Sequence, residues 1–243
     1  MKTIFRRYCS VIVCFVILFH GLGTTAENQE KARYRAARKQ MVQYQIKNRG
    51  IRDPSVLEAM ETVRRHEFVP EDLAEQAYQD RPLSIGYGQT ISQPYIVALM
   101  TELLQIDVGD RVLEVGTGSG YQAAVLARIA AEVYSVEIVR PLHERSEKAL
   151  TRLGYKNVFT SGHDGYFGWE KHSPYDAVIV TCASDFIPPP LIRQLKPGGR
   201  MCIPVGPPFK VQHLVLVEKG KDGKVTSSII ASVRFVPLVR QKE

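Results

Sequence analysis

Residues 112–121 read Val-Leu-Glu-Val-Gly-Thr-Gly-Ser-Gly-Tyr. The apolar start of this stretch is typical of a strand buried on both faces, and its glycines turn the chain sharply into a helix that we expect to begin near Gly120. Free N–H groups at the start of such a helix favour a ligand beside the loop. A dinucleotide site would require the spacing G-x-G-x-x-G, but Tyr121 stands at the third glycine position. The spacing G-x-G-x-G therefore argues against a nicotinamide-dependent oxidoreductase.

Short apolar runs without alternation recur after this loop. Together with the first they are residues 112–115, 133–136, 177–180, 201–205 and 214–217. Helices are expected at about 120–130, 140–152 and 188–195. A last strand is expected over 229–239, broken at Pro237, and Gly198-Gly199 is expected to break the chain before the run at 201–205. Strands that alternate with helices in this way predict a doubly wound, mostly parallel α/β sheet.

The part of the chain before the sheet is predicted to be mainly helical. Residues 27–47 are polar and favour helix, and Asp53 followed by proline is typical of an N-cap that opens a helix over about 54–64. Another helix is expected over 94–105, with apolar residues along one face. Between these helices, residues 82–94 contain Pro, Gly, Ser and Gln, and we expect a loop that is long for a mere connection.

Length and composition indicate a globular chain. It has 243 residues, 44% hydrophobic and 23% charged, and we expect one domain over residues 27–243. The formal net charge is +7, but Lys2, Arg6 and Arg7 are the only charges in residues 1–26, which leaves +4 for the rest. That excess is too small to indicate a nucleic-acid partner. The cysteines form no C-x-x-C pair and have no histidine at metal spacing, so no metal site is expected.

Residues 1–26 have the pattern of a signal peptide or an N-terminal membrane anchor. A basic start precedes an uncharged apolar run at about 8–22, and the small residues 24–26 follow, where a peptidase could cut before Glu27. A fifteen-residue helix spans roughly 22 Å, less than the roughly 30 Å of a bilayer core. Basic residues flank the run on both sides, so the orientation stays open. A cleaved leader, a retained anchor that contacts the membrane through residues 8–22, and a misassigned start codon all remain open.

The glycine loop resembles motif I of class I methyltransferases, which have a Rossmann-like fold and use S-adenosyl-L-methionine. The resemblance implies that Glu137, at the end of the next strand, accepts hydrogen bonds from the ribose hydroxyls, that Asp164 contacts the adenine, and that Glu114 lies near the methionine end. The implied cofactor-binding residues are Glu114, Gly116, Thr117, Gly118, Ser119, Gly120, Glu137, Asp164 and Gly165. Taken singly, Glu137 also fits a solvated strand end and Asp164 a turn former.

The stretch 82–95, Pro-Leu-Ser-Ile-Gly-Tyr-Gly-Gln-Thr-Ile-Ser-Gln-Pro-Tyr, closely resembles the signature of protein-L-isoaspartate O-methyltransferases. Further matches in the family's order are 112–122, 164–169, 175–181, 204–206 and 233–238. The resemblance implies repair of damaged proteins: a methyl group passes from S-adenosyl-L-methionine to the free carboxylate of an L-isoaspartyl residue. The ester then closes to a succinimide, whose hydrolysis partly restores aspartate.

By this resemblance Ser92 is the catalytic serine. A carboxylate is ionised at neutral pH, so the reaction needs positioning rather than a strong base. The implied substrate-binding residues are Thr90, Ile91, Val205, Gly206, Val233 and Val236. An alternative role for Ser92 is to cap the helix that begins around Pro94. The chain departs from the family at His163, where glycine is usual before Asp164.

Other functions are less well matched. An amino-group methyltransferase of nucleic acids would place Asn/Asp-Pro-Pro-aromatic where this chain has Thr181-Cys182-Ala183-Ser184, and a cytosine-C5 enzyme would have a Pro-Cys pair. A class I methyltransferase of another substrate remains an alternative. So does a membrane-tethered or exported module that binds isoaspartyl peptides without turnover. The family and its cofactor supply imply a cytoplasmic location, and leader cleavage would imply a periplasmic one.

Overall fold

The structure is a computed structural model that describes residues 28–241. The signal peptide or anchor expected over residues 1–26 lies outside this range. Within residues 28–241 there is no helix with both the length and the apolar character needed to cross a bilayer.

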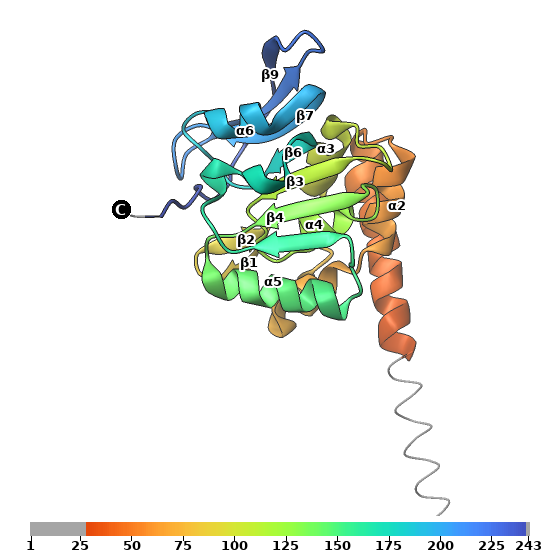
Figure 1. Cartoon of the computed structure of the whole chain (residues 1–243). Helices are drawn as coiled ribbons and strands as arrows, with labels where there is room; N and C mark the ends of the chain where they lie inside the picture. Colours follow the sequence, from red (N-terminus) through yellow and green to blue (C-terminus); the bar gives the residue numbers. More distant parts are fainter. Residues whose placement is uncertain (1–27, 242–243) are drawn as a thin grey trace, which may run out of the picture.

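A seven-stranded sheet with the order β5-β4-β3-β6-β7-β8-β9 forms the centre of the fold (Figure 1). Its strands are β3 (Arg111–Val115), β4 (Glu132–Val136), β5 (Val158–Ser161), β6 (Tyr175–Val180), β7 (Leu195–Val205), β8 (Gln212–Lys219) and β9 (Val225–Val233). The first five strands in spatial order are parallel, and β8 and β9 are antiparallel to their neighbours. The predicted mostly parallel α/β sheet is confirmed.

The sheet changes its direction of winding beside β3. The chain goes from β3 to β4 on one side and later returns to β6 on the other side. The connections on the two sides diverge at the carboxyl ends of the strands, and ligands of open α/β sheets bind in the crevice between them. In Figure 1 the arrowheads of β3 and β4 point toward the side where the C-terminal segment ends.

Two apolar clusters cover the two faces of the sheet. Along β3, Val112 packs into one cluster, whereas Leu113 and Val115 pack into the other. The helical elements are residues 28–40, η1 (Met41–Ile46), η2 (Lys47–Arg49), α2 (Pro54–Thr62), η3 (Arg65–Phe68), η4 (Glu71–Gln76), α3 (Pro94–Leu104), α4 (Tyr121–Leu126), α5 (Arg140–Arg152), η5 (Gly165–Phe167), η6 (Glu170–His172) and α6 (Pro189–Gln194). Residues of α2 to α5 belong to the first cluster, and α6 contributes to the second.

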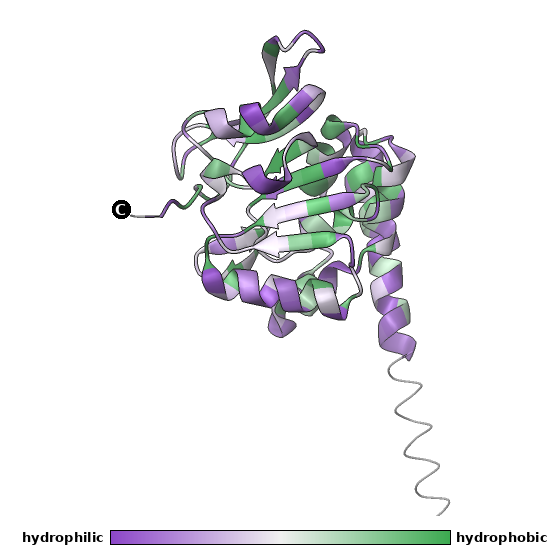
Figure 2. Ribbon diagram, in the orientation of Figure 1, coloured by the Kyte–Doolittle hydropathy of each residue, from purple (hydrophilic) through white to green (hydrophobic). Residues whose placement is uncertain are grey.

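Helix α5 illustrates how amphipathic spacing places a helix on the sheet. Its buried residues are Leu142, Ser146 and Leu150, which recur every four positions and so form one stripe. The remaining residues are mostly charged, and Figure 2 shows the helix as largely hydrophilic. Proline near its start agrees with the first helical turn, where the missing N–H leaves no bond unmade.

The loop expected over residues 82–94 is instead a β-hairpin, followed by the start of α3. Strands β1 (Leu83–Gly86) and β2 (Gln89–Ile91) are antiparallel, and Tyr87 and Gly88 between them have positive φ of 54° and 71°. Such a pair of left-handed residues matches the twist of a two-residue hairpin. Leu83, Ile85 and Ile91 are buried, so alternate apolar residues hold the hairpin against the core. The Gly, Ser and Gln residues between them obscured this alternation in the sequence.

Two further predictions about the strands were wrong in detail. The last strand is Val225–Val233 rather than 229–239, because it pairs with β8 alone as an edge strand and can be largely polar and exposed. Gly198 and Gly199 do not precede β7 but lie within it, at a point where the pairing with β6 shifts register.

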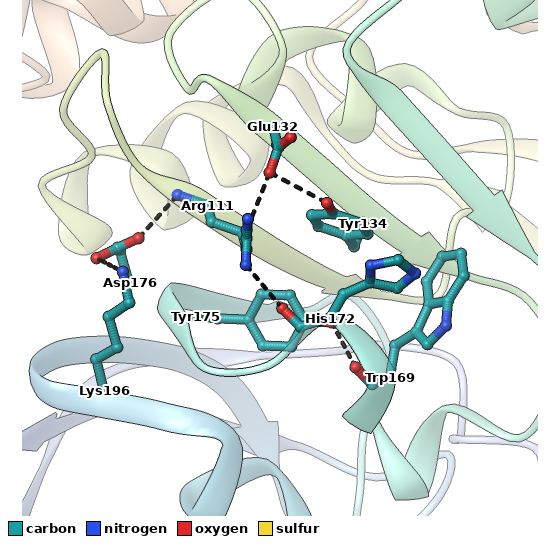
Figure 3. Close-up of polar contacts among 8 residues, drawn as sticks. All are labelled: Arg111, Glu132, Tyr134, Trp169, His172, Tyr175, Asp176 and Lys196. Atoms are coloured by element: carbon teal, nitrogen blue, oxygen red, sulfur yellow. Dashed lines mark hydrogen bonds and ion pairs between the residues drawn. The ribbon is translucent and has the colours of Figure 1, made fainter.

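The amino ends of the strands are tied together by side chains (Figure 3). The Asp176 carboxylate accepts hydrogen bonds from the Arg111 N–H at 2.9 Å and from Lys196 Nζ at 2.7 Å. Arg111 Nε also donates to Glu132 at 2.9 Å. These contacts join the starts of β3, β4, β6 and β7 at the edge opposite the crevice. Nearby, Trp169 packs edge-on against Tyr134, with the ring centres 5.7 Å apart.

Candidate active site

The glycine loop connects β3 to α4 at the carboxyl edge of the sheet. Gly116 has φ of 97°, and a Cβ at this position would lie 2.5 Å from Thr181 Oγ1. The Thr181 hydroxyl donates to the Gly116 carbonyl at 2.6 Å, and the Gly116 N–H donates to the Val136 carbonyl at 2.9 Å. Only glycine therefore lets the loop pass between the ends of the two strands that flank β3.

The carboxylate of Glu137 organises this loop from the end of β4. One oxygen accepts the Gly118 N–H at 2.8 Å, and the other accepts the Val139 N–H at 2.9 Å. The side chain is buried, so Glu137 is not a solvated strand end. Each carboxylate oxygen can accept a second hydrogen bond, which leaves capacity for a hydroxyl donor from a ligand.

Glu114 is fully buried below the loop. Ser135 Oγ donates to one of its carboxylate oxygens, but the other oxygen has no partner among residues 28–241. Burial, assisted by the neighbouring charge of Glu137 and opposed by the hydrogen bond from Ser135, raises the pKa of Glu114 to about 8. A buried acid with an unused oxygen fits a cationic ligand group that would favour its ionised form.

Asp164 is engaged on both oxygens. One accepts the Tyr166 N–H at 3.0 Å and so caps η5, and the other accepts Arg240 Nε at 2.8 Å and the Gln241 N–H at 3.2 Å. Burial alone would raise the pKa of Asp164, but the hydrogen bonds and the Arg240 charge outweigh it and lower that pKa. Beside it, Gly165 packs so closely that a Cβ would meet Val115 at 2.5 Å.

Three adjoining hollows lie along this edge. The largest has a volume of about 620 Å³, and its lining includes Thr90, Ser92 and Thr181. The same three residues also line a small hollow of about 30 Å³ beside the glycine loop. Gly116 joins that small hollow to a third, again about 30 Å³, which is lined by Glu137, Gly165 and residues 237–239 among others. The three hollows adjoin one another through shared lining residues between the hairpin and the end of β4, and together they are called the groove below.

Ser92 follows β2 at the junction of the two first hollows. Its side chain is half-buried, and its hydroxyl makes no hydrogen bond within residues 28–241. The N-cap of α3 is Gln93, and its side chain makes no capping bond. The alternative that Ser92 caps this helix is therefore wrong, and its hydroxyl is available to a ligand.

Of the other predicted binding residues, some line the hollows and some do not. Thr90, Val233 and Val236 line the large hollow, and Ile91 lines the small one. Thr117, Gly118 and Ser119 also line the small hollow, whereas Gly120 packs behind it against α5. Val205 and Gly206 line none of the three; they contact Ser184, whose carbonyl accepts the Gly206 N–H at 2.9 Å.

His163 fits where the family usually has glycine because its ring turns back toward the chain. Nδ1 lies 3.0 Å from Ser161 Oγ, and Nε2 lies 2.8 Å from the Gly168 carbonyl oxygen. The ring therefore staples the turn that carries Asp164.

Some residues that line the groove or contact its predicted residues were not predicted. Thr181, a polar residue that directly follows an apolar run, carried a signal that could have been used. Arg240 and Arg65, which contact Asp164 and Ser92, carried none, because arginines in short polar stretches resemble surface residues. Within the described part of the chain no group of three or more His, Cys, Asp or Glu side chains is arranged to hold a metal ion.

Comparison with known proteins agrees with this geometry. The model of the protein-L-isoaspartate(D-aspartate) O-methyltransferase family matches residues 36–243. A relative from a Polaromonas species, named protein-L-isoaspartate O-methyltransferase 2, is 60% identical over 190 residues, which cover 78% of this chain and 90% of that protein.

Two solved structures share the fold over most of the chain. One, titled protein-L-isoaspartate O-methyltransferase, has a TM-score of 0.74 and 32% identity, and the match covers 82% of this chain and 65% of that one. A putative protein-L-isoaspartate O-methyltransferase from Plasmodium falciparum, in complex with S-adenosyl-L-homocysteine, has a TM-score of 0.72 and 26% identity, with 84% and 99% covered. By sequence and by fold, this chain belongs to the protein-L-isoaspartate(D-aspartate) O-methyltransferase family.

Proposed function

We propose that the chain repairs damaged proteins and peptides by methylating the free carboxylate of their L-isoaspartyl residues, with S-adenosyl-L-methionine as the methyl donor. The observation that carries the proposal is that the unpartnered Ser92 hydroxyl and the glycine loop line one hollow. That hollow shares Thr90, Ser92 and Thr181 with a cavity of about 620 Å³, large enough for a peptide side chain and its neighbours.

The residues around the glycine loop fit the cofactor. Gly116 to Gly120 leave room for close approach, Glu137 offers acceptor capacity to the ribose hydroxyls, and the unpaired oxygen of Glu114 suits the charged methionine end. Because Asp164 is held by Arg240, we assign the adenine contact to this turn as a whole, with Gly165 lining the hollow. When bound, S-adenosyl-L-methionine supplies an electrophilic methyl group.

The residues after the hairpin are suited to hold the substrate. The isoaspartyl carboxylate is ionised at neutral pH, so no side chain has to remove a proton from it. The hydroxyls of Ser92 and Thr90 donate hydrogen bonds that orient the carboxylate without neutralising its charge, and the Ile91 backbone lies beside them. Orientation of the attacking oxygen then supplies most of the acceleration. Val233 and Val236 form an apolar wall for the peptide, and Val205 and Gly206 support this wall from the end of β7.

We further propose that residues 27–243 act as one domain in the cytoplasm, where the cofactor is supplied, and that residues 8–22 contact the membrane if they are retained. N-terminal sequencing of the protein from its own host tests this. Met1 at the start agrees with a cytoplasmic or anchored form, whereas Glu27 at the start means export.

Methyl transfer from labelled cofactor tests the main proposal. We expect label to enter a peptide that contains L-isoaspartate and not the peptide of the same sequence with normal aspartate. Binding of both cofactor and isoaspartyl peptide without transfer would instead support a binding module.

A further inference from the structure

Arg65 is completely buried behind the hairpin that precedes Ser92. Its Nε donates to the Ala77 carbonyl at 2.7 Å, and its Nη2 donates to the Ser92 carbonyl, also at 2.7 Å. The guanidinium carbon lies 4.8 Å from the centre of the Tyr121 ring, at the first residue of α4. One side chain therefore links the segment before the hairpin, the residue after it and the helix behind the glycine loop.

The guanidinium has no acidic partner within residues 28–241. Its Nη1 is buried and makes no hydrogen bond, and its electrostatic neighbours are the hydroxyls of Tyr121 and Tyr78. Burial lowers the pKa of Arg65 to about 10, so the group remains a cation at neutral pH. A buried cation without a counter-ion destabilises the folded protein. A neutral donor could link the same segments without this loss of stability, so a purely structural role does not explain why the group is charged.

The Arg65 charge lies close to the groove, where it can act on a bound ligand. Ser92 and Tyr121, which Arg65 contacts on two sides, both line the small hollow beside the glycine loop. The cation therefore lies directly behind the wall where the proposed substrate presents its carboxylate. An anion at this wall would be attracted through a medium of low polarity, where charges interact strongly.

We propose that Arg65 is a positioning residue for methyl transfer: it fixes the Ser92 peptide group through its carbonyl and supplies the positive potential that selects a carboxylate over a neutral group at this wall. The inference rests on the proposed function and deepens it, because it assigns the discrimination between acid and amide to a residue that does not line the groove.

The test separates charge from structure by substitution. Arg65→Lys keeps the cation, Arg65→Gln keeps a donor but loses the charge, and Arg65→Met fills the site with a neutral apolar chain. Arg152→Gln is the matched control, since it removes the ion pair at 2.8 Å to Glu67 in the same short helix η3 without touching Ser92. Thermal melting of each variant reports whether it is folded.

Two peptides are compared with each enzyme. The KM of an L-isoaspartyl peptide and the inhibition constant of the same peptide with isoasparagine, its neutral amide, give a ratio that measures recognition of the charge. We expect Arg65→Gln and Arg65→Met to raise the KM about tenfold while the amide peptide's constant changes less than about threefold, and Arg65→Lys to preserve the ratio. The affinity for S-adenosyl-L-homocysteine and all constants of Arg152→Gln should stay near those of the parent.

Other outcomes overturn the inference. An unchanged KM in Arg65→Gln and Arg65→Met would remove any role of the charge in recognition. Equal losses for acid and amide peptides, with Arg65→Lys as impaired as the neutral variants, would reduce Arg65 to a structural staple. Failure of the parent enzyme to methylate the isoaspartyl peptide at all would refute the proposed function itself. This result is distinguishable from the others because it is seen in the parent enzyme, without any variant.

Discussion

At Ser92 the chain presents on the wall of the groove a hydroxyl that has no hydrogen-bond partner among residues 28–241. We predict that Ser92→Ala lowers kcat/KM for an isoaspartyl peptide about tenfold to a hundredfold, since a hydrogen bond to a charged group contributes about 1.5–3 kcal/mol. Cofactor affinity should stay near that of the parent, and Ser92→Thr, which retains a hydroxyl, should recover part of the rate. Steady-state kinetics with calorimetry of cofactor binding measures both. An unchanged kcat/KM in the alanine variant would remove Ser92 from the site.

Glu114 gives a second prediction at the scale of one residue. Because burial raises its pKa to about 8 in the folded protein, the folded state keeps a proton that the unfolded chain loses near pH 4.5. The contribution of Glu114 to stability is therefore full below about pH 4.5 and is lost as the pH rises to about 8, by up to about 1.4 kcal/mol per pH unit.

Glu114→Gln removes this dependence. The free energy of unfolding of the cofactor-free variant, measured in urea, should rise relative to that of the parent between pH 5 and pH 8. Glu147→Gln, at an exposed position of α5, serves as the control and should keep the parent's pH profile. A constant difference between the Glu114→Gln variant and the parent across this range would contradict the raised pKa.

At the scale of elements, Glu137 connects the loop after β3 with the start of α5 through two backbone N–H groups. Glu137→Ala removes an acceptor proposed for the ribose and also releases Gly118, so we predict a loss of cofactor affinity of at least about tenfold. Glu137→Gln retains one carbonyl oxygen and should lose less. Calorimetric titration with S-adenosyl-L-homocysteine measures the effect, with Glu144→Ala on the outer face of α5 as the control. Equal dissociation constants in the alanine variant and the parent would refute the assignment.

The elements themselves were predictable where one local pattern sufficed. Asp53 caps α2 through the N–H groups of Ser55 and Val56, as its place before proline predicts, and the buried runs of β3, β4 and β6 form strands where expected. The hairpin at Leu83–Ile91 escaped prediction because only its contacts with the core show which residues alternate. The bounds of β9 were misplaced because an edge strand needs no apolar run.

At the scale of the whole molecule, the C-terminal segment lines the end of the groove that we propose for the cofactor. Pro237, Leu238 and Val239 line the hollow of Glu137 and Gly165, and Arg240 holds the segment by its ion pair with Asp164 and by stacking at 3.7 Å over the Tyr166 ring. We predict that Arg240→Ala speeds dissociation of S-adenosyl-L-homocysteine several-fold, because the C-terminal segment is then held less firmly beside this hollow. Stopped-flow displacement measures this rate.

Lys221→Ala, in the exposed turn after β8, is the control for a lost surface charge and should leave the rate unchanged. A dissociation rate in Arg240→Ala equal to that of the parent would show that the C-terminal segment does not limit exit.

The sequence by itself determined the sheet class and the glycine loop, because each lies in a short stretch with a distinctive local pattern. The roles of Ser92, Glu137 and Asp164 follow from the resemblance of their motifs to the family and stay predictions. Only the tertiary structure decided that Thr181 closes on Gly116, that Asp164 is already paired with Arg240, and that Val205 and Gly206 stand outside the groove lining. It also placed the Arg65 cation behind Ser92, 27 positions away in the chain. Local patterns encode the turns and buried runs of single elements, whereas contacts between distant segments depend on how the elements pack, and no local pattern records that.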